Sequence, residues 1–128
     1  MSLLLLDVGN SRVKWALAGP SGIGPSVAVA HQGVPVSAAK AIDATGVEAI
    51  WIANVTGSSP GEQLACELEN VFDVEPRFAK VQPEFAGLRA GYDEPQRLGV
   101  DRWLCLLAAW SEISGAACVA SAGTALTF

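Results

Sequence analysis

The sequence contains few charged residues, and basic ones are in the minority, which limits the partners it can bind. Charged residues make up 16% of the 128-residue chain, and its 8 Lys and Arg are outnumbered by 13 Asp and Glu. Holding a nucleic-acid backbone requires an excess of Lys and Arg, so we expect no nucleic-acid partner. With 51% hydrophobic residues, the composition instead predicts one compact domain with a well-buried core.

Long apolar runs are missing as well. No uninterrupted apolar run approaches the roughly 20 residues that a helix needs to cross a bilayer. The first residues also lack the basic segment and the longer apolar segment of a signal peptide. We therefore expect no membrane association and a cytoplasmic location.

Cysteine and histidine are too scarce to suggest a site of their own. Cys66, Cys105 and Cys118 are odd in number, widely spaced and surrounded by apolar residues, which disfavours a disulfide framework or a zinc site. We expect them to be core residues. The only histidine, His31, has no triad partner near it in the sequence, which favours a structural or solvent-facing role over catalysis.

The order of the predicted elements indicates an α/β protein. Three strands come first and should form an antiparallel meander. Helices then alternate with strands, and the apolar, β-rich run Val47–Ala53 suits a central strand. The meander is expected at Leu3–Asp7, Val13–Ala18 and Ser26–Ala30, helical segments at Ser37–Ala44, Ser59–Phe72 and Asp101–Ile113, and later strands at Arg77–Val81, Ala117–Ala120 and Leu126–Phe128.

Local signals refine the ends of these elements. Ser59 is the expected N-cap of the first long helix, with Pro60 at its first position, and Gly115 is the expected C-cap of the second. The segment Gln82–Gly99, rich in Gly and Pro, predicts an irregular loop long enough to be functional. Because the chain stops just inside the strand-like Leu126–Phe128, we expect it to be part of a longer protein.

A first glycine-bearing turn, Asp7-Val8-Gly9-Asn10-Ser11, follows an apolar strand. Its glycine would let backbone amides approach an anionic oxygen, and the Asn and Ser after it can donate hydrogen bonds. Its aspartate would position a magnesium ion, directly or through water. Lys14 would neutralise charge on a transferred phosphoryl group. The alternative is an ordinary hairpin turn whose polar side chains satisfy local amides.

A second turn, Ser121-Ala122-Gly123-Thr124, also follows an apolar run and places a hydroxyl beside a glycine. A plain hairpin again explains it equally well on its own. Two such turns after buried strands would place one loop on each side of a cleft that grips the phosphates of a nucleotide.

An acid and a fixed cation stand side by side in Leu98-Gly99-Val100-Asp101-Arg102, where a loop becomes a helix. The helix dipole favours a carboxylate at Asp101, which could accept a hydroxyl proton, and Arg102 could bind a carboxylate or phosphate through two parallel hydrogen bonds. Tyr92, the only tyrosine, could offer its hydroxyl to a polar substrate. The alternatives are a capping acid, a solvated arginine and a loop anchor.

In this order and combination, the motifs resemble those of the N-terminal half of type III pantothenate kinases. The matching segments are Asp7–Ser11 with Lys14, Gly91-Tyr92, Pro95, Leu98–Trp103 and Gly123–Thr127. The resemblance implies a ribonuclease H-like domain over residues 1–128, with a mixed sheet and flanking helices, in the acetate kinase, Hsp70 and actin superfamily. A second domain, beyond these residues, would complete the active site.

The same resemblance implies ATP-dependent phosphorylation of pantothenate, the first step of coenzyme A biosynthesis, in a homodimer that uses Mg²⁺ and a monovalent cation, K⁺ or NH₄⁺. It makes Asp101 the general base for the pantothenate hydroxyl. The implied pantothenate contacts are Tyr92, Gly99, Val100, Asp101 and Arg102, and the implied ATP contacts are Asp7, Val8, Gly9, Asn10, Ser11, Lys14, Gly123 and Thr124.

Two departures from the family pattern affect these expectations. Ser121 stands where the second turn of the family often begins with an aspartate, and the aspartate that the family uses for potassium would follow the last residue. We therefore expect a polypeptide of these 128 residues to turn over poorly or not at all. The alternatives are an accessory transcription factor, a non-catalytic nucleotide-binding relative or an assembly module.

Overall fold

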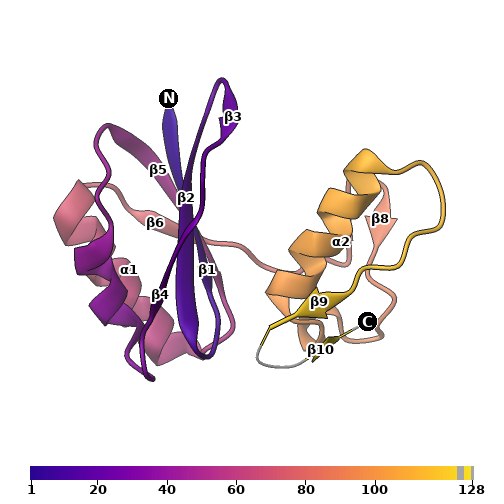
Figure 1. Ribbon diagram of the computed structural model, residues 1–128. Helices are drawn as coiled ribbons and strands as arrows, with labels where there is room; N and C mark the ends of the chain where they lie inside the picture. The colour runs from indigo at the N-terminus through magenta and orange to yellow at the C-terminus, as the bar shows by residue number, and fades with distance from the viewer. Residues whose placement is uncertain (124–125, 128) are drawn as a thin grey trace. The chain divides into compact units, whose positions relative to one another are not determined.

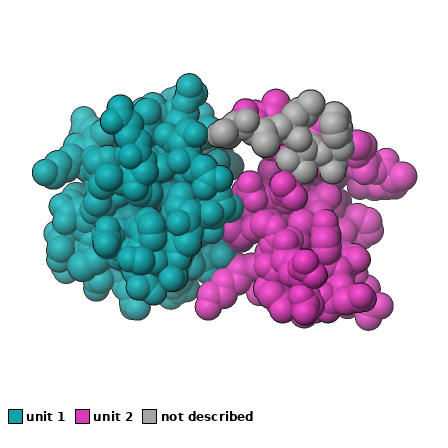
Figure 2. Space-filling view, turned by 90° about the horizontal axis from the view of Figure 1, so that it is seen from below, with its two compact units in different colours: residues 1–79 teal, residues 80–128 magenta. Residues whose placement is uncertain are grey.

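A computed structural model describes residues 1–123 and 126–127 of the chain. These residues divide into two compact units, Met1–Ala79 and Lys80–Phe128, which are coloured teal and magenta in Figure 2. The first unit contains the larger sheet and its core. The second contains two short hairpins and one long helix (Figure 1).

A mixed six-stranded sheet organises the first unit, in the order β3-β2-β1-β5-β6 with β4 also paired to β2. Strand β1 runs antiparallel to β2 and parallel to β5, and β5 runs parallel to β6. The predicted meander and the interior place of the fourth expected strand are thus confirmed. The strands are β1 (Ser2–Val8), β2 (Arg12–Gly19), β3 (Gly22–Ile23), β4 (Val27–Ala30), β5 (Val47–Asn54) and β6 (Pro76–Phe78).

One face of this sheet carries the core. Alternate residues of a strand point to the same face, and Leu4, Leu6 and Val8 of β1 are all almost completely buried. They pack in one cluster with residues of the 3₁₀ helix η1 (Pro35–Ala41) and the helix α1 (Ser58–Phe72). The expected helical segment beginning at Ser37 is therefore a shorter 3₁₀ helix that starts at a proline.

The first long helix does not begin as the sequence predicts, and the assignment of Ser59 as its N-cap is wrong. The N-cap is Gly57, at φ +95°, and no side chain caps it. The side chain of Asn54, at the end of β5, instead donates to the carbonyl of Gly57 at 2.8 Å and accepts two bonds from Thr56. A strand residue therefore organises the turn, and a glycine supplies the backbone conformation that an L side chain rarely adopts.

The second unit replaces most of the expected irregular loop with ordered elements. A hairpin joins β7 (Glu84–Phe85) to β8 (Leu88–Arg89), and the 3₁₀ helix η2 (Pro95–Arg97) follows. The two residues between the strands have φ of +50° and +83°, as in the turns that match the twist of a hairpin. The prediction of an irregular loop over this segment is therefore only partly right.

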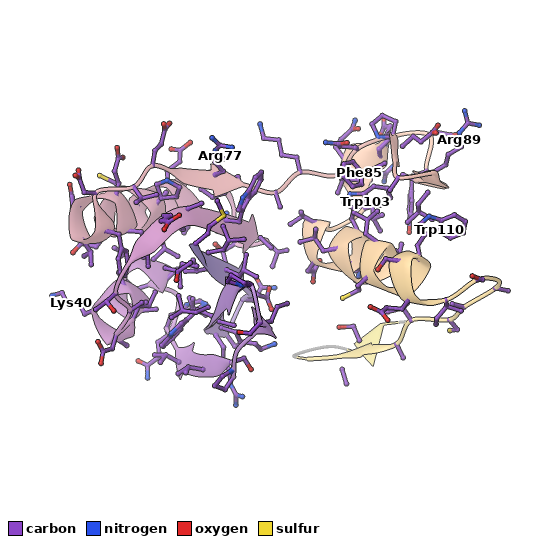
Figure 3. All side chains as sticks on the ribbon, turned by 90° about the horizontal axis from the view of Figure 1, so that it is seen from above. Lys40, Arg77, Phe85, Arg89, Trp103 and Trp110 are labelled. Carbon is purple, nitrogen blue, oxygen red and sulfur yellow. The ribbon has the colours of Figure 1, made fainter. Side chains whose placement is uncertain are left out.

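The helix α2 (Val100–Glu112) confirms the second predicted helix to within one residue at each end. Its C-cap, however, is Ile113 and not Gly115. Trp103 is 1% exposed, and Trp110 donates its indole N–H to the carbonyl of Ala86 in the hairpin at 2.8 Å. Both tryptophans project from α2 toward the hairpin that carries Phe85 and Arg89 (Figure 3).

Two further predictions are wrong. Ala117–Ala120 forms no strand; the short strand β9 is Ser121–Ala122, and it pairs antiparallel with β10 (Leu126–Thr127). The three cysteines are exposed rather than buried, because apolar neighbours in the sequence do not decide which side of an element a residue occupies. None of the described helices combines the length and the apolar composition needed to cross a membrane.

Candidate functional site

The first glycine-bearing turn closes the hairpin between β1 and β2. The N–H of Gly9 donates to the carbonyl of Arg12 at 3.0 Å, and the two residues that follow, Asn10 and Ser11, are exposed. The turn is thus a hairpin that also presents polar groups to solvent. Because the amide of Gly9 is engaged in the turn, hydrogen bonds to a phosphate would have to come from the residues after it.

The local packing does not require a glycine at position 9. A methyl group built there would meet nothing closer than the carbonyl oxygen of Arg12, at an ordinary 3.5 Å, and the backbone does not adopt a positive φ. A residue with a side chain would fit the hairpin. Steric crowding within the hairpin therefore does not account for the glycine, and a glycine here would allow a ligand to approach the backbone closely.

Asp7 and Lys14 form a pair beside this turn. They are opposite each other in the β1–β2 ladder, and Lys14 Nζ lies 3.6 Å from Asp7 Oδ2, with both side chains about half exposed. An exposed ion pair contributes at most about 1 kcal/mol to stability. Either group can therefore exchange its partner for a ligand at little cost.

The donor set at Asp7 fits a magnesium ion that is shared with phosphate oxygens. No group of three or more His, Cys, Asp or Glu side chains in the described residues could hold a metal, and the aspartate is a single half-exposed carboxylate. Mg²⁺ is commonly bound by one or two carboxylates together with substrate phosphates and water. One carboxylate would be sufficient for such a site if the turn beside it held phosphate.

Val8 differs from its neighbours in the turn. Its side chain is completely buried in the core, and its carbonyl accepts the N–H of Val55 at 3.1 Å. Any contact of Val8 with a nucleotide is thus restricted to its backbone.

His31 contacts this turn, and the sequence did not predict that contact. Its Nε2 lies 2.7 Å from the carbonyl oxygen of Gly9, and its backbone N–H donates to Ser11 at 3.2 Å. The pairing of Arg12 with Ala30 in the β2–β4 ladder brings the histidine there. The two partners are 22 positions apart, so only the strand register could have indicated the contact.

In the second unit, Asp101 occupies the first turn of α2 without capping it. One carboxylate oxygen accepts the backbone N–H of Arg102 at 2.9 Å. The N-cap is Gly99, whose carbonyl accepts the N–H of the buried Trp103 at 3.0 Å. Gly99 rather than Asp101 is therefore the N-cap residue, although the carboxylate accepts a first-turn N–H that has no intrahelical acceptor. The carboxylate retains acceptor capacity for a second partner.

Gly99 makes room for this carboxylate. A methyl group built on Gly99 would lie 2.6 Å from Asp101 Oδ1, closer than real carbon atoms approach. The absence of a side chain at position 99 is thus required by the present position of the acid. Val100 and Arg102, which flank Asp101, lie in the same turn of the helix, half-buried and exposed respectively.

Tyr92 lies in an open pocket in the second unit. It is 52% exposed, and with Asp93, Glu94 and Arg97 it lines a volume of about 530 Å³. Arg97 lies 3.7 Å from Glu94 in an ion pair. Residues 99–102 are not among those that line this pocket.

The second glycine-bearing turn lies in the short β9–β10 hairpin. Gly123 is exposed, and a methyl group built on it would meet nothing within 4 Å. Ser121 is exposed in β9. Thr124, the other predicted phosphate contact of this turn, lies outside the described residues.

Comparison with known proteins identifies the family. The model of the family described as "Type III pantothenate kinase" matches residues 3–128. The chain belongs to the type III pantothenate kinase family. The match includes both glycine-bearing turns and the segment around Asp101.

Individual members of the family agree with this assignment. The chain is 37% identical to the type III pantothenate kinase of Nitrosococcus oceani over 134 residues, which cover 98% of this chain and 50% of that protein. It is 36% identical to that of Methylibium petroleiphilum, over 99% of this chain and 54% of the relative, and 36% identical to that of Pseudomonas aeruginosa, over 98% and 51%. The chain thus spans about half the length of these relatives.

Proposed function

We propose that the gene product containing this chain transfers the γ-phosphoryl group of ATP to pantothenate, which yields 4′-phosphopantothenate and begins coenzyme A biosynthesis. The observation that carries this proposal is the family match over residues 3–128, together with relatives named type III pantothenate kinase. The alternatives of a transcription factor or a non-catalytic nucleotide-binding protein have no comparable support.

The first unit would bind the phosphates of ATP. The exposed Asn10 and Ser11 would donate hydrogen bonds to phosphate oxygens, Gly9 would let those oxygens approach, and Lys14 would move from Asp7 to the anionic ligand. Asp7 would then be available to hold Mg²⁺, which neutralises phosphate charge when bound. In this proposal Val8 contributes only its backbone, and Gly123 and Thr124 contribute a second phosphate contact.

The second unit would bind and activate pantothenate. Asp101 would accept the proton of the primary hydroxyl as that oxygen attacks the phosphoryl group. Arg102 would bind the pantothenate carboxylate through parallel hydrogen bonds, as a guanidinium does well. Gly99 and Val100 would contact pantothenate beside the acid, and Tyr92 would offer its hydroxyl to the polar part of the substrate.

Further properties of the protein follow from the family resemblance as proposals. The chain would be a ribonuclease H-like domain of the acetate kinase, Hsp70 and actin superfamily, which the sheet order β3-β2-β1-β5-β6, antiparallel in its first part and parallel in its second, supports. The protein would be a cytoplasmic homodimer that also uses K⁺ or NH₄⁺. No residue of this chain is assigned to the monovalent cation.

A coupled assay of the complete gene product tests the function. ADP release is expected only when ATP, Mg²⁺ and pantothenate are all present, and a panel of other small primary alcohols should give little turnover. The phosphorylated product should be identified by mass spectrometry. ATP binding without pantothenate-dependent ADP release would favour a non-catalytic role and contradict the proposal.

Gly99→Ala is expected to lower kcat for pantothenate phosphorylation by about 10- to 100-fold, because misplacing a catalytic group by about 1 Å can cost 100-fold. The added methyl group would displace the carboxylate of Asp101, which lies within 2.6 Å of its position. Because the displaced atom lies at the end of a flexible side chain, the variant should keep its fold. Its KM for ATP should stay within about 2-fold of wild type. Steady-state kinetics provide the measurement.

Gly19→Ala is the matched control, because a methyl group at Gly19 would make only an ordinary 3.4 Å contact with a backbone oxygen. This variant should keep the wild-type kcat. If Gly99→Ala also keeps it, the position of the Asp101 carboxylate does not limit the reaction.

A further inference from the structure

The imidazole of His31 joins two loops of the first unit. His31 is 3% exposed, and among the described residues it is the only polar or charged one that is buried. Its Nδ1 accepts the backbone N–H of Gly33 at 3.1 Å, and its Nε2 lies 2.7 Å from the carbonyl oxygen of Gly9. Both ring nitrogens are thus engaged, one with each loop.

These two partners define the state of the ring. A backbone N–H can only donate, so Nδ1 must act as an acceptor toward Gly33 and carries no hydrogen. A carbonyl oxygen can only accept, so Nε2 carries the hydrogen and donates it to Gly9. The histidine is therefore a neutral donor aimed at one carbonyl of the first turn. Its backbone N–H holds a second carbonyl of that turn, at Ser11.

Fixing the carbonyl of Gly9 also fixes an amide. The carbonyl of Gly9 and the N–H of Asn10 belong to one planar trans peptide and point in opposite directions. With the carbonyl directed inward to the buried imidazole, the N–H of Asn10 is directed away from it. Glycine restrains the rotation of such a peptide less than any other residue, so an external restraint on this peptide has a large effect.

We propose that His31 is a positioning residue for ATP, which orients the Gly9–Asn10 peptide so that the amide of Asn10 meets a phosphate oxygen. This inference rests on the proposed function, because it assumes that the first turn binds phosphate. The N–H of Gly9 is already engaged with Arg12, which leaves the amide of Asn10 as the next donor along the turn. His31 itself touches neither substrate in this proposal.

Two substitutions separate the roles of the two ring nitrogens. In His31→Asn, the side-chain oxygen can replace Nδ1 as the acceptor for Gly33, but no donor reaches Gly9. In His31→Gln, the longer amide can place its N–H₂ near the position of Nε2 and donate to Gly9. The first variant therefore loses the contact that the proposal requires, and the second retains it.

In the complete gene product, His31→Asn is expected to raise the KM for ATP about 10-fold, the range for removing one buried hydrogen-bond partner, with the KM for pantothenate unchanged. His31→Gln should restore the KM for ATP to within about 3-fold of wild type. A purely structural histidine would alter both KM values together, or would lower the unfolding midpoint of both variants equally. Equal KM values for ATP in the two variants would overturn the proposal.

Direct measurements keep this inference separate from the proposed function. If the wild-type protein binds Mg–ATP but does not phosphorylate pantothenate, the proposed function fails, and the dissociation constants of the two variants for Mg–ATP still decide the role of His31. Should His31→Asn not fold, the amide signal of Asn10 in the ¹⁵N NMR spectrum of the wild-type protein is decisive. It should shift on addition of Mg–ATP, and an unchanged signal would overturn the proposal, as would an absence of ATP binding.

Discussion

Asp101→Asn in the complete gene product is expected to lower kcat for pantothenate phosphorylation by about 10²- to 10⁴-fold, the usual contribution of a general base. The amide that replaces the carboxylate cannot accept the proton of the pantothenate hydroxyl. Its oxygen can still accept the N–H of Arg102, as the carboxylate does at 2.9 Å. The first turn of α2 should therefore keep its geometry, and the loss should reflect chemistry rather than folding.

Steady-state kinetics and a separate titration with ATP check this prediction. The affinity for ATP should stay within about 2-fold of wild type, because the substitution acts on the acceptor hydroxyl and not on the phosphate-binding turn. Glu112→Gln is the matched control, since it removes a carboxylate from the last turn of the same helix. Full turnover in Asp101→Asn, or an equal loss in Glu112→Gln, would exclude Asp101 as the base.

The parts of the fold that the sequence predicts well are those set by local patterns. The apolar run that begins at Leu3 is visible in the sequence and predicts β1, whereas the burial of Leu4, Leu6 and Val8 on one face is seen only in the structure. The apolar spacing of α2 predicts both of its ends to within one residue. Each of these elements is predicted by the apolar pattern of its own segment, a continuous run for β1 and a helical spacing for α2.

The predictions from sequence fail where a residue distant in the sequence determines the local structure. The first turn of α1 depends on the amide of Asn54 at the end of a strand, so the local signal at Ser59 was misleading. The apolar run Ala117–Ala120 has the composition of a strand, but the hydrogen-bonded pairs of this hairpin join β9 and β10 instead. A segment forms a strand only if a second strand pairs with it, and the sequence of the segment does not determine whether such a partner is present.

The candidate site shows the same division. Sequence motifs select Asp7, Asp101 and the glycines beside them as candidates, because the chemistry proposed for them is carried by residue type and spacing. They could not predict the ion pair between Asp7 and Lys14, which depends on the β1–β2 register. Nor could they show that Gly99 leaves room for the acid of α2, since that depends on the conformation of a single side chain.

Gly61→Ala is expected to destabilise the first unit by about 2 kcal/mol, within the usual range for overpacking a core. Gly61 is a buried residue of α1, and a methyl group there would overlap the amide nitrogen of Asn54 and approach its Cγ to 2.9 Å and a ring carbon of Phe78 to 3.4 Å. Asn54 cannot simply turn away, because its amide holds Gly57 and Thr56. The steric cost of the methyl group should exceed the roughly 1 kcal/mol by which alanine stabilises a helix relative to glycine.

The two side chains should therefore be coupled. Asn54→Ala removes the hydrogen bonds to the start of α1 and destabilises by itself, but it also removes the atoms that the new methyl group would meet. In that background Gly61→Ala should cost less than about 0.5 kcal/mol, or stabilise, since only the 3.4 Å contact with Phe78 and the gain in helix propensity then remain. Urea unfolding of the four proteins of this cycle gives the coupling free energy. Additive effects would mean that Asn54 does not limit the approach of α1 to β5, and that its hydrogen bonds alone account for its contribution to stability.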